Sequence, residues 1–194
     1  MKRRILIPTI SLFAVLGSAY AQMPIDKHSH AHDHAPMPKH MKATMVAKAI
    51  AVITPTKGNT AHGVVTFEKV EDGVKVSGKI EGLTPGKHGF HVHQYGDLDS
   101  DDGTATGGHF NPMQTEHGGP EMPMYHAGDM GNVMANEDGV AEFSFVMPHM
   151  MLNGPASIVG RGLIVHGGED DLVSQPSGAA GPRVGQAVIG VAKD

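Results

Sequence analysis

The sequence contains no cysteine and no tryptophan, and aromatic residues make up only 5% of its 194 positions. Without cysteine no disulfide bond can form, so the fold must rely on packing and on any bound metal. The scarcity of aromatic residues, together with 26 glycines and 13 prolines, argues against a helical bundle and favours short strands joined by turns. The length allows one domain with a hydrophobic core.

Positive charge is also in short supply, since 15 basic residues face 20 acidic ones. Residues 1–21 have the pattern of a secretory signal, with basic residues at 2–4, an apolar run at 5–16 and Ala-Tyr-Ala at 19–21. The apolar run is short for a membrane span, and an uncleaved anchor is the alternative. Cleavage would remove basic residues only and leave a more acidic chain. We therefore expect an exported protein, periplasmic or extracellular, that binds neither nucleic acid nor membrane.

Residues 22–47 are polar and rich in histidine and methionine, with no hydrophobic period. This composition predicts a disordered tail. Alternating imidazoles can chelate Cu(II) or Zn(II), so we expect weak metal capture, with an inert solvated leader as the alternative. The alternating histidines are His28, His30, His32 and His34.

Residues 48–194 form the predicted domain, in which about eight short β-type runs follow one another. Turn signals at 71–73 and 136–139 predict hairpins, and the pattern favours an all-β antiparallel sandwich or barrel. Two long stretches, 96–130 and 167–183, do not fit strands, and loops of that length are usually functional. The predicted strands are 49–54, 63–70, 74–81, 89–95, 131–135, 140–146, 157–165 and 186–192.

Histidines gather beside both long loops. His91 and His93 are two residues apart in a predicted strand, so both rings project to one face and form half of a copper or zinc site. His166 ends a further apolar run, where a rigid strand opens into a loop. The first loop adds three imidazoles and a carboxylate, which suffice for a tetrahedral zinc site. These four residues are His109, His117, His126 and Asp129.

Several of these segments resemble the copper/zinc superoxide dismutases, over roughly residues 48–193. The Gly-His-Phe-Asn-Pro and Gly-Asp-Met-Gly-Asn stretches are more similar to the eukaryotic-type branch. The resemblance implies a Greek-key β-sandwich or barrel that binds one copper and one zinc per subunit. The segments are 91–112, His-Gly-Gly-Pro at 117–120, His-Ala-Gly-Asp-Met-Gly-Asn at 126–132 and Gly-Arg-Gly-Leu-Ile-Val-His at 160–166.

By this resemblance, one histidine would be shared between the two ions. Asp170 would link a copper-binding and a zinc-binding histidine through hydrogen bonds, and Arg183 would guide the anionic substrate. The implied copper ligands are His91, His93, His109 and His166. The implied zinc ligands are His109, His117, His126 and Asp129.

The implied activity is the conversion of superoxide to dioxygen and hydrogen peroxide by redox cycling of copper, with zinc in a structural role. His109 would leave the copper and take up a proton during the cycle. A homodimer is the expected quaternary state. One alternative is a non-enzymatic exported protein that binds copper and zinc on the same fold. Another is a metal-stapled structural sandwich, which leaves the copper histidines unexplained.

The chain departs from the family pattern at a disulfide bond. The first cysteine position falls within residues 99–107, which contain no cysteine, and the second is occupied by Gln186. We therefore expect a loose metal-free form, and a stability that reducing agents leave unchanged. His62 and His88 are expected at the surface or in turns, and so is His149, for which a loose metal contact is the alternative.

Overall fold

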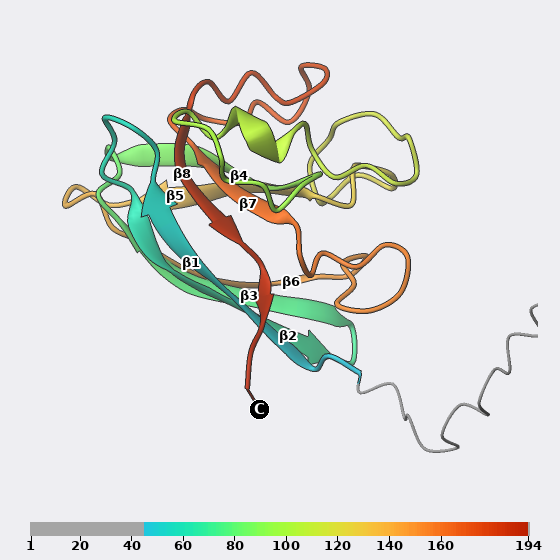
Figure 1. The fold of residues 1–194 in the computed structure, drawn as a ribbon. Coiled ribbons are helices and arrows are strands. Elements are labelled where there is room, and N and C mark those ends of the chain that lie inside the picture. The colour runs from blue at the N-terminus through green and yellow to red at the C-terminus, as the bar shows by residue number, and fades with distance from the viewer. Residues whose placement is uncertain (1–44, 194) are drawn as a thin grey trace, which may run out of the picture. The chain divides into compact units, whose positions relative to one another are not determined.

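The computed structural model describes residues 45–193, so the predicted signal and residues 22–44 of the predicted tail lie outside it. The described residues form nine antiparallel strands and one short 3₁₀ helix, η1, and the strands curl into a nearly closed barrel (Figure 1). The predicted all-β class is confirmed. No helix in this part of the chain is long and apolar enough to cross a membrane. The strands are β1 (Lys48–Pro55), β2 (His62–Val70), β3 (Gly73–Glu81), β4 (Gly86–His93), β5 (Asp129–Ala135), β6 (Ala141–Met147), β7 (Gly162–His166), β8 (Arg183–Val188) and β9 (Gly190–Val191).

The strand order is β5-β4-β7-β8-β1-β2-β3-β6, and β9 pairs with β1. β1, β2 and β3 follow one another as hairpins, and the predicted turn at residues 71–73 closes with the pair Val70 and Gly73. In contrast, β3 pairs with β6 and β4 pairs with β7, so the chain crosses between distant parts of the sheet. Such crossings distinguish a Greek-key barrel from an up-and-down one.

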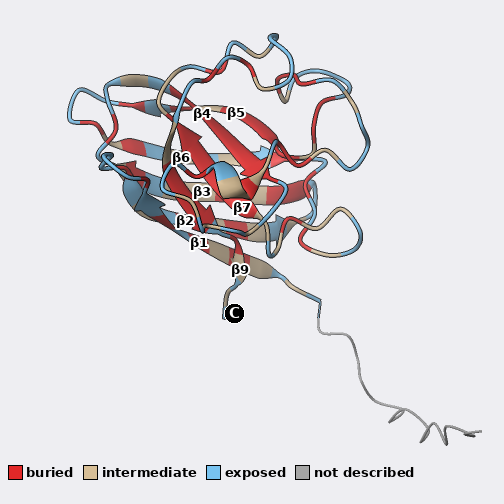
Figure 2. Cartoon of the chain, turned by 45° about the horizontal axis from the view of Figure 1, so that its top comes forward, coloured by how far each residue is buried: buried red, intermediate tan, exposed pale blue. Residues whose placement is uncertain are grey.

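The hydrophobic core fills the barrel, as the buried positions in Figure 2 show. Alternate residues of β1 (Ala49, Ala51 and Ile53) point inward, as the period of two in a strand requires. β4 and β7 are different, because their residues are buried on both faces. One face of these two strands meets the core, and the other is covered by the long loops.

Two loops cover that outer face. Residues 94–128 connect β4 to β5 and contain η1 (Thr104–Thr106), and residues 167–182 connect β7 to β8. Figure 1 shows both loops on the same side of the barrel, above β4, β7 and β8. The barrel therefore brings together the two segments that the sequence marked as functional.

The strand boundaries differ from the prediction most in the last two predicted strands. β7 begins at Gly162, because the N–H of Arg161 bonds to the Ile158 carbonyl at 3.1 Å and residues 157–161 form turns. The last predicted strand is divided into β8 and β9 at Ile189. The N–H of Ile189 bonds to the Arg161 carbonyl at 2.9 Å, so β9 changes its partner to the start of β1.

Candidate metal centre

β4 presents an imidazole pair to the covering loops. His91 and His93 share one face of the strand, and Phe90 and Val92 point into the core. The register against β5 shifts between Gly89 and His91. Such a bulge turns a side chain locally. Because His91 and His93 still share one face of β4, the alternation predicted from the sequence is confirmed for this pair.

Two further histidines complete a group around this pair. His166 ends β7, the neighbour of β4, and His109 lies in the first long loop with its backbone paired to that of His93. All four side chains are buried, and one ring nitrogen of each lies within 4.8 Å of the others. The four-histidine group consists of His91, His93, His109 and His166.

A second group surrounds Asp129, the first residue of β5. Its Oδ1 lies 2.7 Å from His109 Nδ1 and 3.2 Å from His126 Nδ1. Its Oδ2 lies 2.9 Å from His117 Nδ1. These four buried residues form the three-histidine–aspartate group. Because His109 belongs to both groups, its two ring nitrogens connect them.

One ring nitrogen of each histidine has no hydrogen-bond partner, although buried polar atoms nearly always have one. The Nδ1 atoms of His93 and His166 lie 2.9 and 3.0 Å from the carbonyls of Gly107 and Gly181. A carbonyl only accepts, so these nitrogens carry the proton and the opposite nitrogens offer lone pairs. The unpartnered atoms are His91 Nδ1, His93 Nε2, His109 Nε2, His117 Nδ1, His126 Nδ1 and His166 Nε2.

These donors fit two different cations. Four imidazole nitrogens are a donor set that suits copper. Three imidazoles with one carboxylate are the donor set of a closed zinc site. His117 Nδ1 and His126 Nδ1 approach Asp129 closely without the geometry of a hydrogen bond, as ligands of one ion do.

Asp170, in the second loop, links the two groups. Its Oδ2 accepts a hydrogen bond from His91 Nε2 at 2.8 Å, and its Oδ1 accepts one from His117 Nε2 at 2.9 Å. The side chain of Asn132 holds the Asp170 backbone, donating to its carbonyl and accepting from its N–H. One buried carboxylate therefore fixes the tautomer of a ring in each group.

Burial keeps three imidazoles of the four-histidine group neutral, those of His93, His109 and His166. It lowers the pKa of His93 to about 2 and the pKa of His166 to about 3, because an imidazolium there would lose its hydration. Burial also lowers the pKa of His109 to about 4, although Asp129 opposes the shift. Neutral rings are the form in which histidine binds a metal.

In the three-histidine–aspartate group, contacts between imidazoles and carboxylates outweigh burial in setting the pKa values. Burial lowers the pKa of His117, but its close contacts with the carboxylates of Asp129 and Asp170 outweigh burial and raise that pKa to about 9. Burial raises the pKa of both carboxyls, yet hydrogen bonds from the histidines bring each below its ordinary value. A cation in this group would therefore displace a proton from His117.

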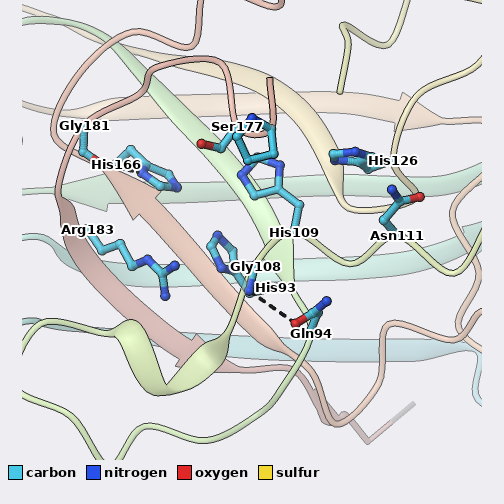
Figure 3. Close-up of a pocket in the computed structure, with 11 residues that line it drawn as sticks. His93, Gln94, Gly108, His109, Asn111, His126, His166, Ser177, Gly181 and Arg183 are labelled. Atoms are coloured by element: carbon cyan, nitrogen blue, oxygen red, sulfur yellow. Dashed lines mark hydrogen bonds between the residues drawn. The ribbon is translucent and has the colours of Figure 1, made fainter. Parts of the chain in front are cut away.

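A pocket of about 440 Å³ leads to the four-histidine group (Figure 3). His93, His109 and His166 form part of its wall, and Arg183 at the start of β8 lies beside them. Among the described residues that line the pocket, Arg183 is the one that keeps a charge at every working pH. The pocket thus combines a buried imidazole cluster with a fixed positive charge.

Arg183 also ties the first loop to the barrel. Its guanidinium donates to the carbonyls of Gly103 and Gly107 at 2.6 and 2.7 Å and to Thr106 Oγ1 at 2.9 Å. A Cβ on Gly103 would lie 3.3 Å from Gln186 Oε1. The first loop and the second cysteine position of the family are therefore adjacent, but no disulfide bond joins them.

Two site residues were not predicted from the sequence, and the burial of one histidine was predicted wrongly. Asn132 and Gln175 hold the backbones of Asp170 and His117, but they lie 38 and 58 positions away, and a single amide side chain carries no pattern. His88 was expected at the surface and is instead buried. Its Nδ1 can donate to the His166 carbonyl at 2.8 Å while its Nε2 accepts from Thr84 Oγ1 at 3.4 Å, which makes burial of the polar ring tolerable.

Fold and site together define a β-barrel protein with two adjoining groups of residues that could each hold a metal ion and that share a histidine. The family model for copper/zinc superoxide dismutase matches residues 61–189. The extracellular superoxide dismutase [Cu-Zn] of Brugia pahangi is 42% identical over 157 residues, which are 76% of this chain and 78% of that protein. The chain belongs to the copper/zinc superoxide dismutase family.

Two further comparisons agree. The superoxide dismutase [Cu-Zn] of Paramecium bursaria Chlorella virus 1 is 42% identical over 165 residues, covering 81% of this chain and 87% of the viral protein. The crystal structure of the clock protein EA4 superposes with a TM-score of 0.72 at 41% identity, covering 79% of this chain and 99% of that one.

Proposed function

We propose that the protein is a superoxide dismutase, an oxidoreductase that converts superoxide to dioxygen and hydrogen peroxide with copper and zinc as cofactors. The observation that carries this is the set of six unpartnered ring nitrogens that converge on two points around the shared His109. When bound, copper supplies the one-electron redox chemistry, since zinc has none of its own. Family membership supports the same activity.

The ligand assignment follows the donor sets. His91, His93, His109 and His166 would hold copper, and His109, His117, His126 and Asp129 would hold zinc. Asp170 orients one ring of each set. The Nε2 of His109, on the copper side, is the atom at which this chain can hold a proton for the peroxide product.

Arg183 is proposed to receive the substrate. Its guanidinium reaches the pocket beside His93 and keeps its positive charge at any working pH (Figure 3). Three hydrogen bonds to the first loop fix its position. A small anion would therefore be drawn toward the four-histidine group and away from bulk water.

Rapid mixing with superoxide tests the activity against its main alternative, a non-enzymatic metal-binding protein. Preparations with both metals, with zinc only and with no metal are compared at equal protein concentration. We expect fast consumption in the first alone. Stoichiometric binding of both metals without turnover would favour the alternative.

Export and metal capture by the tail are proposed from the sequence. A relative that is named extracellular supports export. The alternating histidines are His28, His30, His32 and His34. Export predicts a mature protein that begins at residue 22, which N-terminal sequencing checks.

Removing residues 22–44 should lower the amount of copper bound at limiting supply, and an unchanged amount would contradict capture.

A homodimer is proposed through an apolar surface patch. Tyr95, Val188 and Val191 are 59%, 38% and 63% exposed. A Cβ on Gly96, the neighbour of Tyr95, would lie 3.1 Å from Val188 Cγ1, so the chain at Tyr95 runs beside Val188, and Val191 follows three residues later. Sedimentation equilibrium should give a dimer that Val191→Asp converts to a monomer. A monomeric unmodified protein would contradict this assignment.

A further inference from the structure

Besides Asp170, the second long loop holds the metal centre through one amide side chain, that of Gln175. Gln175 Oε1 accepts a hydrogen bond from the N–H of His117 at 2.8 Å, and Gln175 Nε2 donates to the His117 carbonyl at 2.9 Å. The side-chain amide thus pairs with a backbone unit as a neighbouring strand would. It fixes the backbone of a buried histidine of the three-histidine–aspartate group.

The residues that follow lie directly on the link between the two groups. We call residues 174–178 the strap. Gly178 has φ +67° and is buried, and a Cβ there would overlap Asp170 Oδ1 and lie 2.7 Å from His117 Nε2. Only glycine permits both this backbone conformation and this close approach. The strap therefore packs directly against the hydrogen bond between Asp170 and His117.

The same strap forms part of the pocket wall. Pro176 and Ser177 line the pocket together with His93, His109 and Arg183 (Figure 3). One residue of the strap thus holds His117, while the next two face the space above the four-histidine group.

The strap is also stiff, because the carboxylate of Asp171 closes its base. The backbone N–H groups of Val173 and Ser174 donate to Asp171 Oδ1 at 2.9 and 2.8 Å. The N–H of Asp171 in turn donates to the Gly178 carbonyl at 2.9 Å. A segment closed in this way moves as a unit when one of its members moves.

We propose that Gln175 is a positioning residue that ties the three-histidine–aspartate group to the wall of the substrate pocket. A cation bound by His117 then fixes the strap, and the strap fixes Pro176 and Ser177. The description of the pocket as a substrate pocket rests on the proposed function, whereas the tie itself rests on the contacts above.

The test uses Gln175→Met in the full-length protein. Methionine matches glutamine in length but cannot make the two hydrogen bonds, and Gln175 is largely exposed, so the core is not disturbed. Zinc affinity is measured by competition with a chromogenic chelator. The visible spectrum of Co²⁺ in the zinc position reports ligand geometry, and hydrogen exchange with and without zinc reports the strap.

We expect zinc affinity to fall about tenfold, as when other residues that hold a ligand are removed. The cobalt bands should shift, and the protection that zinc gives to residues 174–178 should be lost. Gln175→Glu retains only the acceptor for the His117 N–H, so its zinc affinity should lie between those of the unmodified protein and Gln175→Met. Val173→Ala, an exposed change beside the strap, is the matched control and should match the unmodified protein.

The fold of each variant is checked by far-ultraviolet circular dichroism, which does not need cobalt. Unchanged zinc affinity and an unchanged cobalt spectrum in Gln175→Met would overturn the proposal, as would equal losses in Val173→Ala. All three readouts are independent of turnover, so an absence of dismutase activity would refute the proposed function without deciding this inference.

Discussion

Asp170 contacts one ring in each of the two histidine groups. Each of its carboxylate oxygens accepts a hydrogen bond from one ring, His91 on one side and His117 on the other. The carboxylate is almost completely buried, so water cannot replace these bonds. A change at this single position therefore acts on two sites at once.

Asp170→Asn tests that role. The amide nitrogen would face one ring N–H, so that ring loses its partner, and the other ring would donate to a neutral amide oxygen instead of a carboxylate. We expect the affinities for zinc and copper to fall 10- to 100-fold, roughly the effect of losing a partner of a metal-binding histidine. Competition titrations measure both, with the exposed Glu169→Gln as control. Unchanged affinities would show that the rings are oriented by packing alone.

The histidines also set the pH dependence of the metal-free protein. The pKa values of His93, His109 and His166 lie below the ordinary 6.5, so below that pH the unfolded chain binds protons that the folded chain does not. Stability should fall on acidification, by up to about 1.4 kcal/mol per pH unit for each group.

His117 acts in the opposite direction. Its pKa is raised to about 9, so its contribution is present below pH 6.5 and is lost as the pH rises toward 9. Urea unfolding of the metal-free protein should therefore give a maximum of stability near pH 6.5. A free energy of unfolding that increased steadily in either direction would contradict these shifts.

At the level of elements, β8 and the first long loop are joined through Arg183. We expect Arg183→Ala to lower the rate with superoxide about tenfold or more, because the fixed charge of the pocket is lost. Arg183→Lys should retain part of the rate. In both variants amide exchange at residues 103–107 should quicken, because the three bonds from the guanidinium are gone. Slow exchange in Arg183→Ala would mean that other contacts hold the loop.

The sequence predicted the elements that depend on local pattern. The alternation of His91 and His93 and the hairpin at residues 71–73 follow from the period of a strand and from turn chemistry. The convergence of His109 and His166 on that pair could be expected only from the family resemblance. The split at Ile189 and the contact of Gln175 with His117 arise from tertiary pairing, which leaves no mark in the local sequence.

At the scale of the whole molecule, the barrel lacks the covalent link that would hold the first loop. Lys57 and Asp101 supply a backbone hydrogen bond of 2.8 Å and an exposed ion pair, which together replace a disulfide only in part. Loss of such a bond commonly costs about 2–5 kcal/mol in a small exported domain. Metal binding only to the folded state offsets that loss.

Thermal unfolding checks this balance. Zinc at about a thousand times its dissociation constant should add about 4 kcal/mol, which raises the Tm of the metal-free protein by roughly 10 °C. A reductant that does not bind metals should leave the Tm unchanged, since the sequence has no cysteine. A Tm that shifted with such a reductant would show that the stability has another redox-sensitive source.

The central claim is that two ions share His109. Anomalous diffraction from crystals of the copper- and zinc-loaded protein, recorded at both absorption edges, tests it most directly. We expect copper beside His109 Nε2, His91, His93 and His166, and zinc beside His109 Nδ1, His117, His126 and Asp129. Ions that leave His109 uncoordinated, or a single ion in their place, would contradict it.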